Sequence, residues 1–325
     1  MKVQEHDMPE VAIVVPVHNE AGNVRELHAR TAAACATLDF ALFFVDDGST
    51  DDTAALCREL AESDPRVNLV SLVANVGHQV ALHAGLAHAR GEYVIMMDGD
   101  LQHPPELIPR MIECARRQRA DVVHMIKTGS KEGPFKRAFS FLFYRVFNAL
   151  TGSALVPGAS DFRLITRRVH RVLLSLVERR PFYRAMIPAL RFPACSLTFE
   201  VPPRFAGRSS YTFLKSMRLA VEAFLYHSTM PLHVMMVVGM IVAVSAFLYA
   251  LISIGVRLAA AERVVPGWAD VIVSILILGG LNLTFLGLIG KYIALLIEHE
   301  KHRPTYIVDE ERSRLHAPQR EEIPV

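Results

Sequence analysis

The last third of the chain contains two long apolar stretches, and they constrain the fold more than any other feature. The first, PLHVMMVVGMIVAVSAFLYALISIGV, covers residues 231–256 without an Asp, Glu, Lys or Arg. The second covers residues 271–297, with Lys291 as its one charged residue. Each is longer than the roughly 20 residues that a helix needs to cross a hydrocarbon layer about 30 Å thick. Two buried core helices are the alternative, but length and missing charge favour two transmembrane helices.

Basic residues outside this pair predict its orientation. They are Arg208, Lys215 and Arg218 before the first stretch, and Lys301, Arg303, Arg312 and Arg314 after the second. The linker at 257–270 is short and holds two basic and two acidic residues. Because positively charged flanks stay in the cytoplasm, we expect both large flanks and both termini there. The opening MKVQEHDMPE is polar, so we do not expect a signal peptide.

The bulk composition excludes some classes of partner and site. Of the 325 residues, 51% are hydrophobic and 21% are charged, which is enough apolar sequence for a large core. The net charge of +2 does not indicate a polyanionic partner, and we expect no nucleic acid. The cysteines, Cys35, Cys57, Cys114 and Cys195, are far apart, so neither a zinc site nor a disulfide framework is expected.

Residues 1 to about 205 alternate between apolar strands and helices. Strands are predicted at 11–17, 41–47, 67–73, 93–98 and 121–127. Helices are predicted at 19–38, from the turn at 46–53 through Leu60, at 77–90 and at 104–119. Alternation of this kind favours an α/β fold with a mostly parallel sheet that is covered on both faces. Ligands of such sheets bind beyond the carboxyl ends of the strands.

Acidic pairs follow two of these strands. Asp46 and Asp47 end the second strand, and Asp98 and Asp100 follow the fourth, in MDGDLQHPPE. Carboxylates at the edge of a core are costly without a positive partner, so the pairs indicate a cation. Asp-x-Asp suits a divalent metal that holds a diphosphate, because Mg²⁺ and Mn²⁺ prefer oxygen ligands and keep substrate phosphates among them. The pair alone is a weak signal, since turns and helix caps use the same residues more often.

A series of motifs gives a stronger indication. In order they are VPVHNE (15–20), VDDGSTDDT (45–53), ANVGHQVALHAGL (74–86), MDGDLQHPPELI (97–108) and SDFRLITRR (160–168). With them the chain resembles the inverting family 2 glycosyltransferases of GT-A (Rossmann-like) fold. More narrowly it resembles the polyprenyl-phosphate branch, which includes dolichyl-phosphate mannose synthases and undecaprenyl-phosphate aminoarabinose transferases. RFAGRSSYTF (204–213) and GLIGKYIALLIEHEKHRPTYIV (287–308) also have counterparts in bacterial members, so the resemblance covers nearly the whole chain.

The resemblance implies a site for a nucleotide sugar and a divalent metal, Mg²⁺ or Mn²⁺. The residues that match nucleotide-binding positions are Pro16, Glu20, Asp46, Asp47, Asn75, Gln79 and Asp98. Among them, Asp47 would accept a hydrogen bond from the base. Asp98 and Asp100 match the metal-binding Asp-x-Asp, with Gly99 where alanine is more usual, and Gln102 matches the amide that completes the metal's ligands.

The resemblance also implies an acceptor site. Asp161 matches the acid often proposed as the catalytic base, and Arg163 is a second catalytic candidate. Lys127 and Arg137 match basic positions that meet the acceptor phosphate or the donor diphosphate, and Arg204 matches the arginine of a juxtamembrane motif. All three are candidates for binding the acceptor phosphate. Lys127 stands where arginine is usual, which loses two-pronged phosphate binding. A phosphate monoester has a second pKa of ~6, so it is largely ionised at neutral pH and does not require a strong base. Asp161 therefore acts either as a base or as a positioning group.

Histidines are weaker candidates. His78, His83 and His88 are five residues apart, not the three or four that would place metal ligands on one helical face. His78 could contact the site through its loop. His103 follows the Asp-x-Asp directly and is a candidate neighbour of the metal.

The expected function is metal-dependent, inverting transfer of a sugar from a nucleotide-sugar donor, with UDP preferred, to a polyprenyl (undecaprenyl) phosphate. Such a reaction serves cell-envelope glycan synthesis or lipid A modification. One alternative is a catalytically silent membrane-bound scaffold that binds a nucleotide sugar. Another is a glycosyltransferase with a different lipid acceptor.

The expected organisation is a cytosolic GT-A catalytic domain at 1–208, an interfacial helix at 209–229, two transmembrane helices within 230–297 (about 231–256 and 271–297) and a cytosolic tail at 298–325. The resemblance implies a multi-pass protein of the bacterial inner (cytoplasmic) membrane, in contact with membrane lipid. It also implies a homo-oligomer, with a tetramer as one form.

Overall fold

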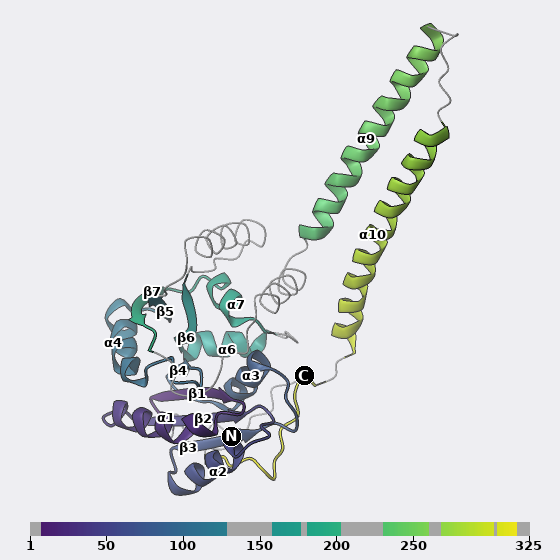
Figure 1. The fold of residues 1–325 in the computed structure, drawn as a ribbon. Helices are drawn as coiled ribbons and strands as arrows, with labels where there is room; N and C mark the ends of the chain where they lie inside the picture. Colours follow the sequence, from purple (N-terminus) through teal and green to yellow (C-terminus); the bar gives the residue numbers. More distant parts are fainter. Residues whose placement is uncertain are drawn as a thin grey trace. The chain divides into compact units, whose positions relative to one another are not determined.

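In the computed structural model, the residues described are 8–128, 158–176, 181–202, 230–259, 268–301 and 304–316 (Figure 1). The chain divides into two compact units, Met1–Ser210 with Pro304–Val325, and Tyr211–Arg303. The described residues of the first unit form a sheet with covering helices, and those of the second form two long helices. The predicted interfacial helix at 209–229 lies outside the described residues.

In the part of the chain that the structure describes, seven strands form one sheet in the order β3-β2-β1-β4-β6-β5-β7. The strands are β1 (Val11–Val17), β2 (Phe40–Asp46), β3 (Val67–Ser71), β4 (Tyr93–Met96), β5 (Val122–Thr128), β6 (Ala159–Thr166) and β7 (Ala194–Glu200). β1 to β4 pair in parallel, as do β5 and β7. β6 is antiparallel to both of its neighbours. The prediction of a mostly parallel α/β sheet is confirmed.

Hydrophobic layers cover both faces of this sheet. The helices of the unit are α1 (Ala21–Ala34), α2 (Thr53–Ser63), α3 (His78–His88), α4 (Ile108–Gln118), α6 (Arg167–Ser175) and α7 (Tyr183–Ala189), with the 3-10 helix η2 (Pro105–Leu107) before α4. Helices α1, α2 and α4 pack on one face, and α3, α6 and α7 on the other. Along β1, Ile13 faces the first layer and Val14 the second. Burial on both faces explains why the central strands are unbroken apolar runs.

The sequence analysis did not predict β6 or β7. β6 carries Asp161 and Arg163 near its middle, and these interrupt the apolar pattern. β7 is at the edge of the sheet and alternates exposed with buried residues. A strand with one open face carries a weaker apolar signal than a central strand.

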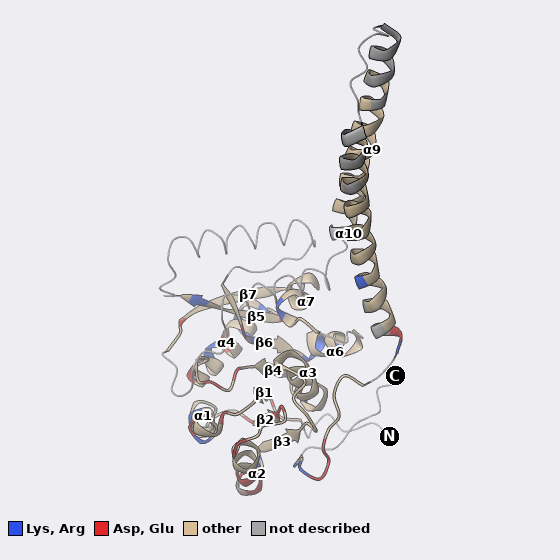
Figure 2. Ribbon diagram, turned by 45° about the vertical axis from the view of Figure 1, so that its right-hand side comes forward, with Lys and Arg blue, Asp and Glu red and all other residues tan. Residues whose placement is uncertain are grey.

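The long helices of the second unit are α9 (Met230–Ala259) and α10 (Trp268–Glu300), which lie side by side (Figure 1). A Cβ on Gly239 of α9 would lie 3.8 Å from the ring of Phe285 in α10, so the small residue allows close approach. Their described apolar side chains are largely exposed, and Figure 2 shows few charged residues along them. Long helices with exposed apolar side chains are typical of a lipid environment.

Among the described residues, one stretch is long and apolar enough to cross a membrane, Ile277–Ala294 in α10. Helix α9 contains a shorter apolar stretch, Val234–Tyr249. The two helices coincide with the two predicted spans, but only the span in α10 meets this criterion. The span predicted at 231–256, in α9, stays a prediction, and so does the transmembrane hairpin.

The tail segment, residues 304–316, lies along the edge of the sheet in the first unit. It runs antiparallel to β3, and Leu69 and Arg314 exchange two backbone hydrogen bonds of 2.7 and 2.8 Å. Tyr306 and Val308 pack against the hydrophobic layer that contains α3. The tail segment therefore covers hydrogen-bonding groups that an edge strand would otherwise expose.

Two cysteines lie closer together than their spacing in the sequence indicates. The sulfur atoms of Cys114 on α4 and Cys195 on β7 are in contact, although the residues are 81 apart in the sequence. Helix α4 packs against β7, so the fold brings together residues whose spacing gave no signal. Cys35 and Cys57 are buried free thiols.

We predict that Arg314→Pro releases the tail segment, because proline has no backbone N–H to donate to the carbonyl of Leu69. Subtilisin should cut the segment about fivefold faster, the ratio that corresponds to roughly 1 kcal/mol of lost hydrogen bonding. Arg314→Ala keeps the N–H and should be cut at the wild-type rate. Equal rates for the two variants would contradict the pairing.

His170 on α6 predicts a pH dependence of stability. Its side chain is 5% exposed, and its Nε2–H donates to the carbonyl of Leu86 at 2.8 Å. Burial lowers the pKa of His170 from 6.5 to about 4, although the Leu86 carbonyl opposes this shift. The unfolded chain therefore binds more protons than the folded chain as the pH falls below about 6.5, and roughly 2 kcal/mol of stability is lost by about pH 5.

The measurement is thermal unfolding of the full chain in detergent at about pH 7.5 and about pH 5. We expect the decrease in unfolding temperature to be smaller in His170→Gln, which keeps a donor for Leu86 but does not titrate. An identical decrease in both proteins would refute the assignment to His170.

Candidate functional site

The carboxyl ends of β1, β2 and β4 meet at one edge of the sheet, and the candidate site forms there. Val17 pairs with Asp46, and the backbone N–H of Asp47 donates to the carbonyl of Val17 at 2.9 Å. The N–H of Met97, directly after β4, donates to the carbonyl of Val14 at 3.0 Å. The two acidic pairs therefore start from the same edge.

The first acidic pair, Asp46 and Asp47, is buried and holds neighbouring loops. Asp47 accepts hydrogen bonds from the backbone N–H groups of Val76 and Gly77 at 2.7 and 3.0 Å, one on each oxygen. Asp46 accepts from the N–H of Ser49 at 3.1 Å. A carboxylate offers about four lone-pair sites, so the predicted contact of Asp47 with a base would share oxygens already used by the loop.

Other predicted nucleotide-binding residues surround this pair. Pro16 is buried in β1 opposite Val45. Glu20 accepts a hydrogen bond from the side-chain amide of Asn23. Asn75 is exposed on the loop that Asp47 holds.

Two glycines allow the loops of the site to approach closely. Gly48 has φ +60°, and a Cβ there would lie 2.6 Å from the backbone nitrogen of Asn75. A Cβ on Gly99 would lie 2.9 Å from Cγ1 of Val17. Both the left-handed conformation of Gly48 and its backbone contact exclude other residues. The contact of Gly99 gives a physical reason for glycine where alanine is more usual.

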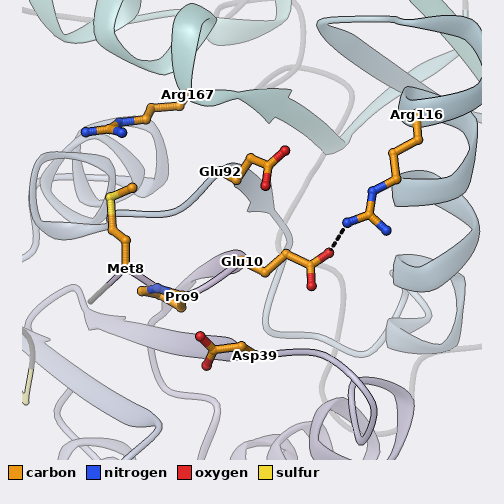
Figure 3. Close-up of a pocket in the computed structure, with 7 residues that line it drawn as sticks. All are labelled: Met8, Pro9, Glu10, Asp39, Glu92, Arg116 and Arg167. Carbon is orange, nitrogen blue, oxygen red and sulfur yellow. Dashed lines mark hydrogen bonds and ion pairs between the residues drawn. The ribbon is translucent and has the colours of Figure 1, made fainter. Parts of the chain in front are cut away.

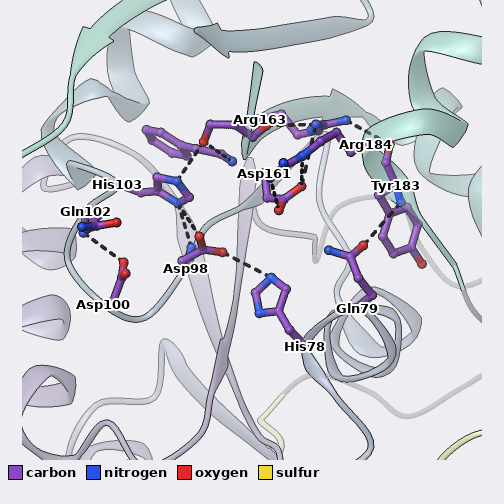
Figure 4. Close-up of polar contacts among 12 residues, drawn as sticks. His78, Gln79, Asp98, Asp100, Gln102, His103, Asp161, Arg163, Tyr183 and Arg184 are labelled. Atoms are coloured by element: carbon purple, nitrogen blue, oxygen red, sulfur yellow. Dashed lines mark hydrogen bonds and ion pairs between the residues drawn. The ribbon is translucent and has the colours of Figure 1, made fainter. Parts of the chain in front are cut away.

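Asp98 lies between two histidines (Figure 4). Its Oδ1 is 3.3 Å from Nε2 of His78, and its Oδ2 is 3.5 Å from Nδ1 of His103. The backbone N–H of Asp98 donates to Nδ1 of His103 at 3.0 Å, so this nitrogen is an acceptor. Nε2 of His103 is 2.8 Å from Oγ of Ser160. Burial lowers the pKa of His103, in agreement with a neutral ring that joins the turn at 98–103 to β6.

Charges from three elements act on these groups. Burial opposes the ionisation of Asp98, but the hydrogen bond and charge of His78 and the charge of Lys127 hold the pKa of its carboxyl below the usual value. Burial likewise opposes the protonation of His78, but Asp98 and Asp161 raise its pKa. Asp98, Lys127 and Asp161, from the β4 turn, β5 and β6, therefore share one electrostatic environment.

Asp100 and Gln102 complete the turn. Oδ1 of Asp100 accepts from the backbone N–H of Gln102 at 3.1 Å, and Leu101 between them has φ +61°. A leucine in this left-handed region is uncommon and costs on the order of 1–3 kcal/mol, and such strain concentrates at functional sites. The turn is thus held in a conformation that leucine does not favour.

The donor set of this turn suits a metal that is held partly by its substrate. Among the described residues, no group of three His, Cys, Asp or Glu side chains is placed to hold a metal ion. Mg²⁺ usually takes one or two carboxylates from a protein and its other ligands from phosphates and water. The oxygens of Asp98, Asp100 and Gln102 fit that kind of site.

Asp161 is paired with an arginine that the sequence analysis missed. Nε and Nη2 of Arg184 donate to the two oxygens of Asp161 at 3.3 and 2.7 Å (Figure 4). Arg163 is 4.0 Å from Asp161, but its side chain is 1% exposed and donates to the carbonyls of Tyr183 and Ser160 at 3.0 and 2.9 Å. Arg163 therefore holds the backbone, and its placement does not support the prediction of substrate contact.

Tyr183 connects this region to α3. Its hydroxyl is 2.6 Å from Nδ1 of His83, and its backbone N–H donates to Oε1 of Gln79 at 3.4 Å. The ring of Tyr306 from the tail segment meets His83 edge-on, with 6.2 Å between ring centroids. The start of α7, which carries Arg184, is therefore fixed from several sides.

The structure gathers many of the predicted site residues. Figure 4 shows this group, which comprises Gln79, Asp98, Asp100, Gln102, Asp161 and Arg163. Arg137 and Arg204 lie outside the described residues. Arg184 and Tyr183 belong to the run RRPFYR (179–184), which no motif marked. Its aromatic and basic composition was the one available signal.

A separate pocket of about 480 Å³ lies at the opposite ends of the strands (Figure 3). Glu10, Asp39 and Glu92, each directly before a strand, line it together with Arg116 and Arg167. Because ligands of such sheets bind beyond the carboxyl ends, this pocket is not the expected place for a substrate.

Comparisons with known proteins agree with the motifs. The model of glycosyl transferase family 2 matches residues 12–174. A bactoprenol glucosyl transferase of Shigella phage SfV is 33% identical over 94% of this chain and 99% of its own length. An undecaprenyl-phosphate 4-deoxy-4-formamido-L-arabinose transferase of Klebsiella pneumoniae is 32% identical over 92% of each chain.

A solved structure that matches part of this chain is glucosyl-3-phosphoglycerate synthase from Mycobacterium tuberculosis, in complex with Mn²⁺, UDP and phosphoglyceric acid. It is 18% identical, with a TM-score of 0.47 over 69% of this chain and 80% of that chain. A likeness at this level carries no argument about function.

We predict that Gly48→Ala destabilises the protein by more than about 2 kcal/mol, because the methyl group meets backbone atoms in a left-handed conformation. Gly158→Ala is the matched control, since Gly158 has φ +74° but its Cβ would have no neighbour nearer than 3.4 Å. Urea unfolding of the full chain in detergent measures both. Equal losses would show that the contact with Asn75 is unimportant.

Proposed function

This chain belongs to glycosyltransferase family 2, and we propose that it transfers a sugar from a nucleotide diphosphate to a polyprenyl phosphate, with inversion at the anomeric carbon. The two relatives described above, whose names specify bactoprenol or undecaprenyl phosphate, support the lipid acceptor. UDP is the preferred nucleotide. The sugar belongs to cell-envelope glycan synthesis or lipid A modification.

The observation that carries the proposal is the convergence of Asp98 and Asp161 on one polar cluster. They come from different elements, yet they lie in one group of polar side chains (Figure 4). A group-transfer enzyme needs its donor and acceptor sites adjacent, because positioning the reactants supplies much of the rate enhancement. Asp98 and Asp100 serve the donor in this proposal, and Asp161 serves the acceptor.

On the donor side, Asp98, Asp100 and Gln102 would hold Mg²⁺ or Mn²⁺, which neutralises charge on the departing diphosphate. Asp47 holds the loop at 75–77 beside the nucleotide. Glu20, Asn75 and Gln79 are the other nucleotide-binding residues of the proposal. His103 fixes the turn that carries Asp98.

On the acceptor side, an oxygen of the lipid phosphate forms a bond to the anomeric carbon while the bond to the nucleotide diphosphate breaks. The nucleotide leaves with the electron pair of that bond. A phosphate monoester is largely a dianion above its second pKa of ~6, so the oxygen is already a nucleophile. Asp161 positions the acceptor or accepts its residual proton.

The lipid acceptor gives a reason for the long helices. The span in α10, with α9 as the second span, would keep the catalytic domain at the cytoplasmic face of the bacterial inner membrane. There the head group of the acceptor is concentrated, while the donor arrives from solution. The interfacial helix at 209–229, Arg137 and Arg204 complete the acceptor side in this proposal. Self-association, up to a tetramer, belongs to the same proposal.

The direct test uses the full chain, purified in detergent, with Mn²⁺ and undecaprenyl phosphate. The donors are UDP-glucose, UDP-N-acetylglucosamine, UDP-4-deoxy-4-formamido-L-arabinose and GDP-mannose. We expect one donor to release its nucleotide only when the lipid is present. Binding of a donor without release in any combination would favour the alternative of a silent scaffold. Release of nucleotide only with a different lipid would show that this other lipid is the acceptor.

We predict that Asp100→Ala lowers turnover by about 100-fold or more, since metal stabilisation of the leaving group contributes several kcal/mol. The thermal stabilisation by UDP with Mn²⁺ should also disappear. Glu106→Gln is the matched control, because Glu106 follows the same turn but pairs with Arg30 at 2.7 Å. Wild-type turnover in Asp100→Ala would count against the metal site.

A further inference from the structure

The pair of Asp161 and Arg184 has a geometry that a phosphate can take over. The guanidinium of Arg184 uses two nitrogens on the two carboxylate oxygens, at 3.3 and 2.7 Å. A phosphate presents two oxygens to the same planar fork and binds it in the same two-pronged way. Without an acceptor, Asp161, the acid proposed for the acceptor, is therefore paired with Arg184, a side chain that can bind phosphate.

The two arginines next to Asp161 differ in their ability to move. Arg163 is 1% exposed and donates to the carbonyls of Tyr183 and Ser160, so its displacement would leave buried groups without partners. The side chain of Arg184 is 34% exposed and is held by a carboxylate. A charged ligand that replaces a carboxylate keeps the guanidinium paired. Asp161, whose side chain is 15% exposed, then keeps Arg163 at 4.0 Å.

The backbone under Arg184 is fixed, which makes its side chain the part that moves. The neighbouring Tyr183 is almost completely buried and is bound through its hydroxyl to His83, through its N–H to Gln79 and through its carbonyl to Arg163. Figure 4 shows Tyr183 and Arg184 on the same side of Asp161 as Arg163. A new partner for Arg184 would therefore bind within reach of its side chain, beside Asp161.

The position of Arg184 favours the acceptor phosphate over the donor diphosphate. Arg184 bonds to Asp161 on β6, the acid proposed for the acceptor. The acids proposed for the metal, Asp98 and Asp100, instead lie in the turn after β4.

We propose that Arg184 binds the phosphate of the lipid acceptor, and that this phosphate replaces Asp161 as its partner. The inference rests on the proposed function and adds a residue and a step to it. When the phosphate takes the fork of Arg184, both oxygens of Asp161 are released beside the nucleophile. The pair then keeps Asp161 occupied until the acceptor arrives.

Binding measurements on the full chain in detergent test the exchange, with undecaprenyl phosphate in micelles and UDP with MnCl₂ as separate probes. Arg184→Gln should weaken binding of undecaprenyl phosphate by about tenfold or more, the loss expected for a charge-assisted pair. The affinity of Arg184→Lys for undecaprenyl phosphate should lie between those of the wild type and Arg184→Gln, since lysine keeps the charge but not the planar fork. Binding of UDP with Mn²⁺ should change less than about threefold, which also reports that the variant is folded.

A double-mutant cycle isolates the exchange itself. Asp161→Asn removes the competing carboxylate, so it should tighten binding of undecaprenyl phosphate while turnover falls. In the Arg184→Gln background, the same substitution should give no gain. A gain of equal size in both backgrounds would reflect general electrostatics and would overturn the exchange. Arg168→Gln is the control, because Arg168 is exposed and pairs with Asp121 at 3.6 Å.

The remaining outcomes separate this inference from the proposed function. If the wild-type protein does not bind undecaprenyl phosphate, the proposed function is wrong and the inference fails with it. If Arg184→Gln binds the lipid like the wild type, the proposed function stands and the role of Arg184 is refuted. If the variant loses UDP with Mn²⁺ as well, Arg184 supports the donor or the fold, and its assignment to the acceptor is overturned.

Discussion

The parallel pairing of β1, β2 and β4 is the constraint on which the rest of the structure depends. It brings Asp46, Asp47 and the turn that carries Asp98 to one edge of the sheet. Carboxylates cannot be buried there without partners, and the structure supplies backbone N–H groups for Asp47 and His78 for Asp98. The apolar strands are thus the scaffold that allows a polar site to exist at the boundary of the core.

The antiparallel strand β6 joins the second half of the site to the first. It carries Asp161, and its Ser160 contacts His103, which in turn accepts from the backbone of Asp98. A family 2 glycosyltransferase that acts on a lipid must hold two anionic substrates together, and this network couples their proposed sites. The tail segment reaches the same region through Tyr306 and His83, so the chain after α10 also packs against it.

Much of this could be predicted from the sequence, because the signals are local. Unbroken apolar runs gave β1 to β5, and the motifs gave the acids that end β2 and β4. Arg184 could not be predicted, since its pairing with Asp161 depends on a strand and a helix that the local pattern did not reveal. Arg163 matched a family position, but its burial and its two carbonyl partners depend on packing. The pairing of the tail segment with β3 is likewise a long-range contact without a local signal.

The most direct test of the account is an experimental structure of the full chain with UDP and Mn²⁺, in which anomalous scattering locates the metal. The account predicts Mn²⁺ bound to the pyrophosphate and to Asp98 or Asp100, with Asp161 facing the same space. Nucleotide and metal at the other end of the strands, in the pocket of Glu10, Asp39 and Glu92, would contradict it.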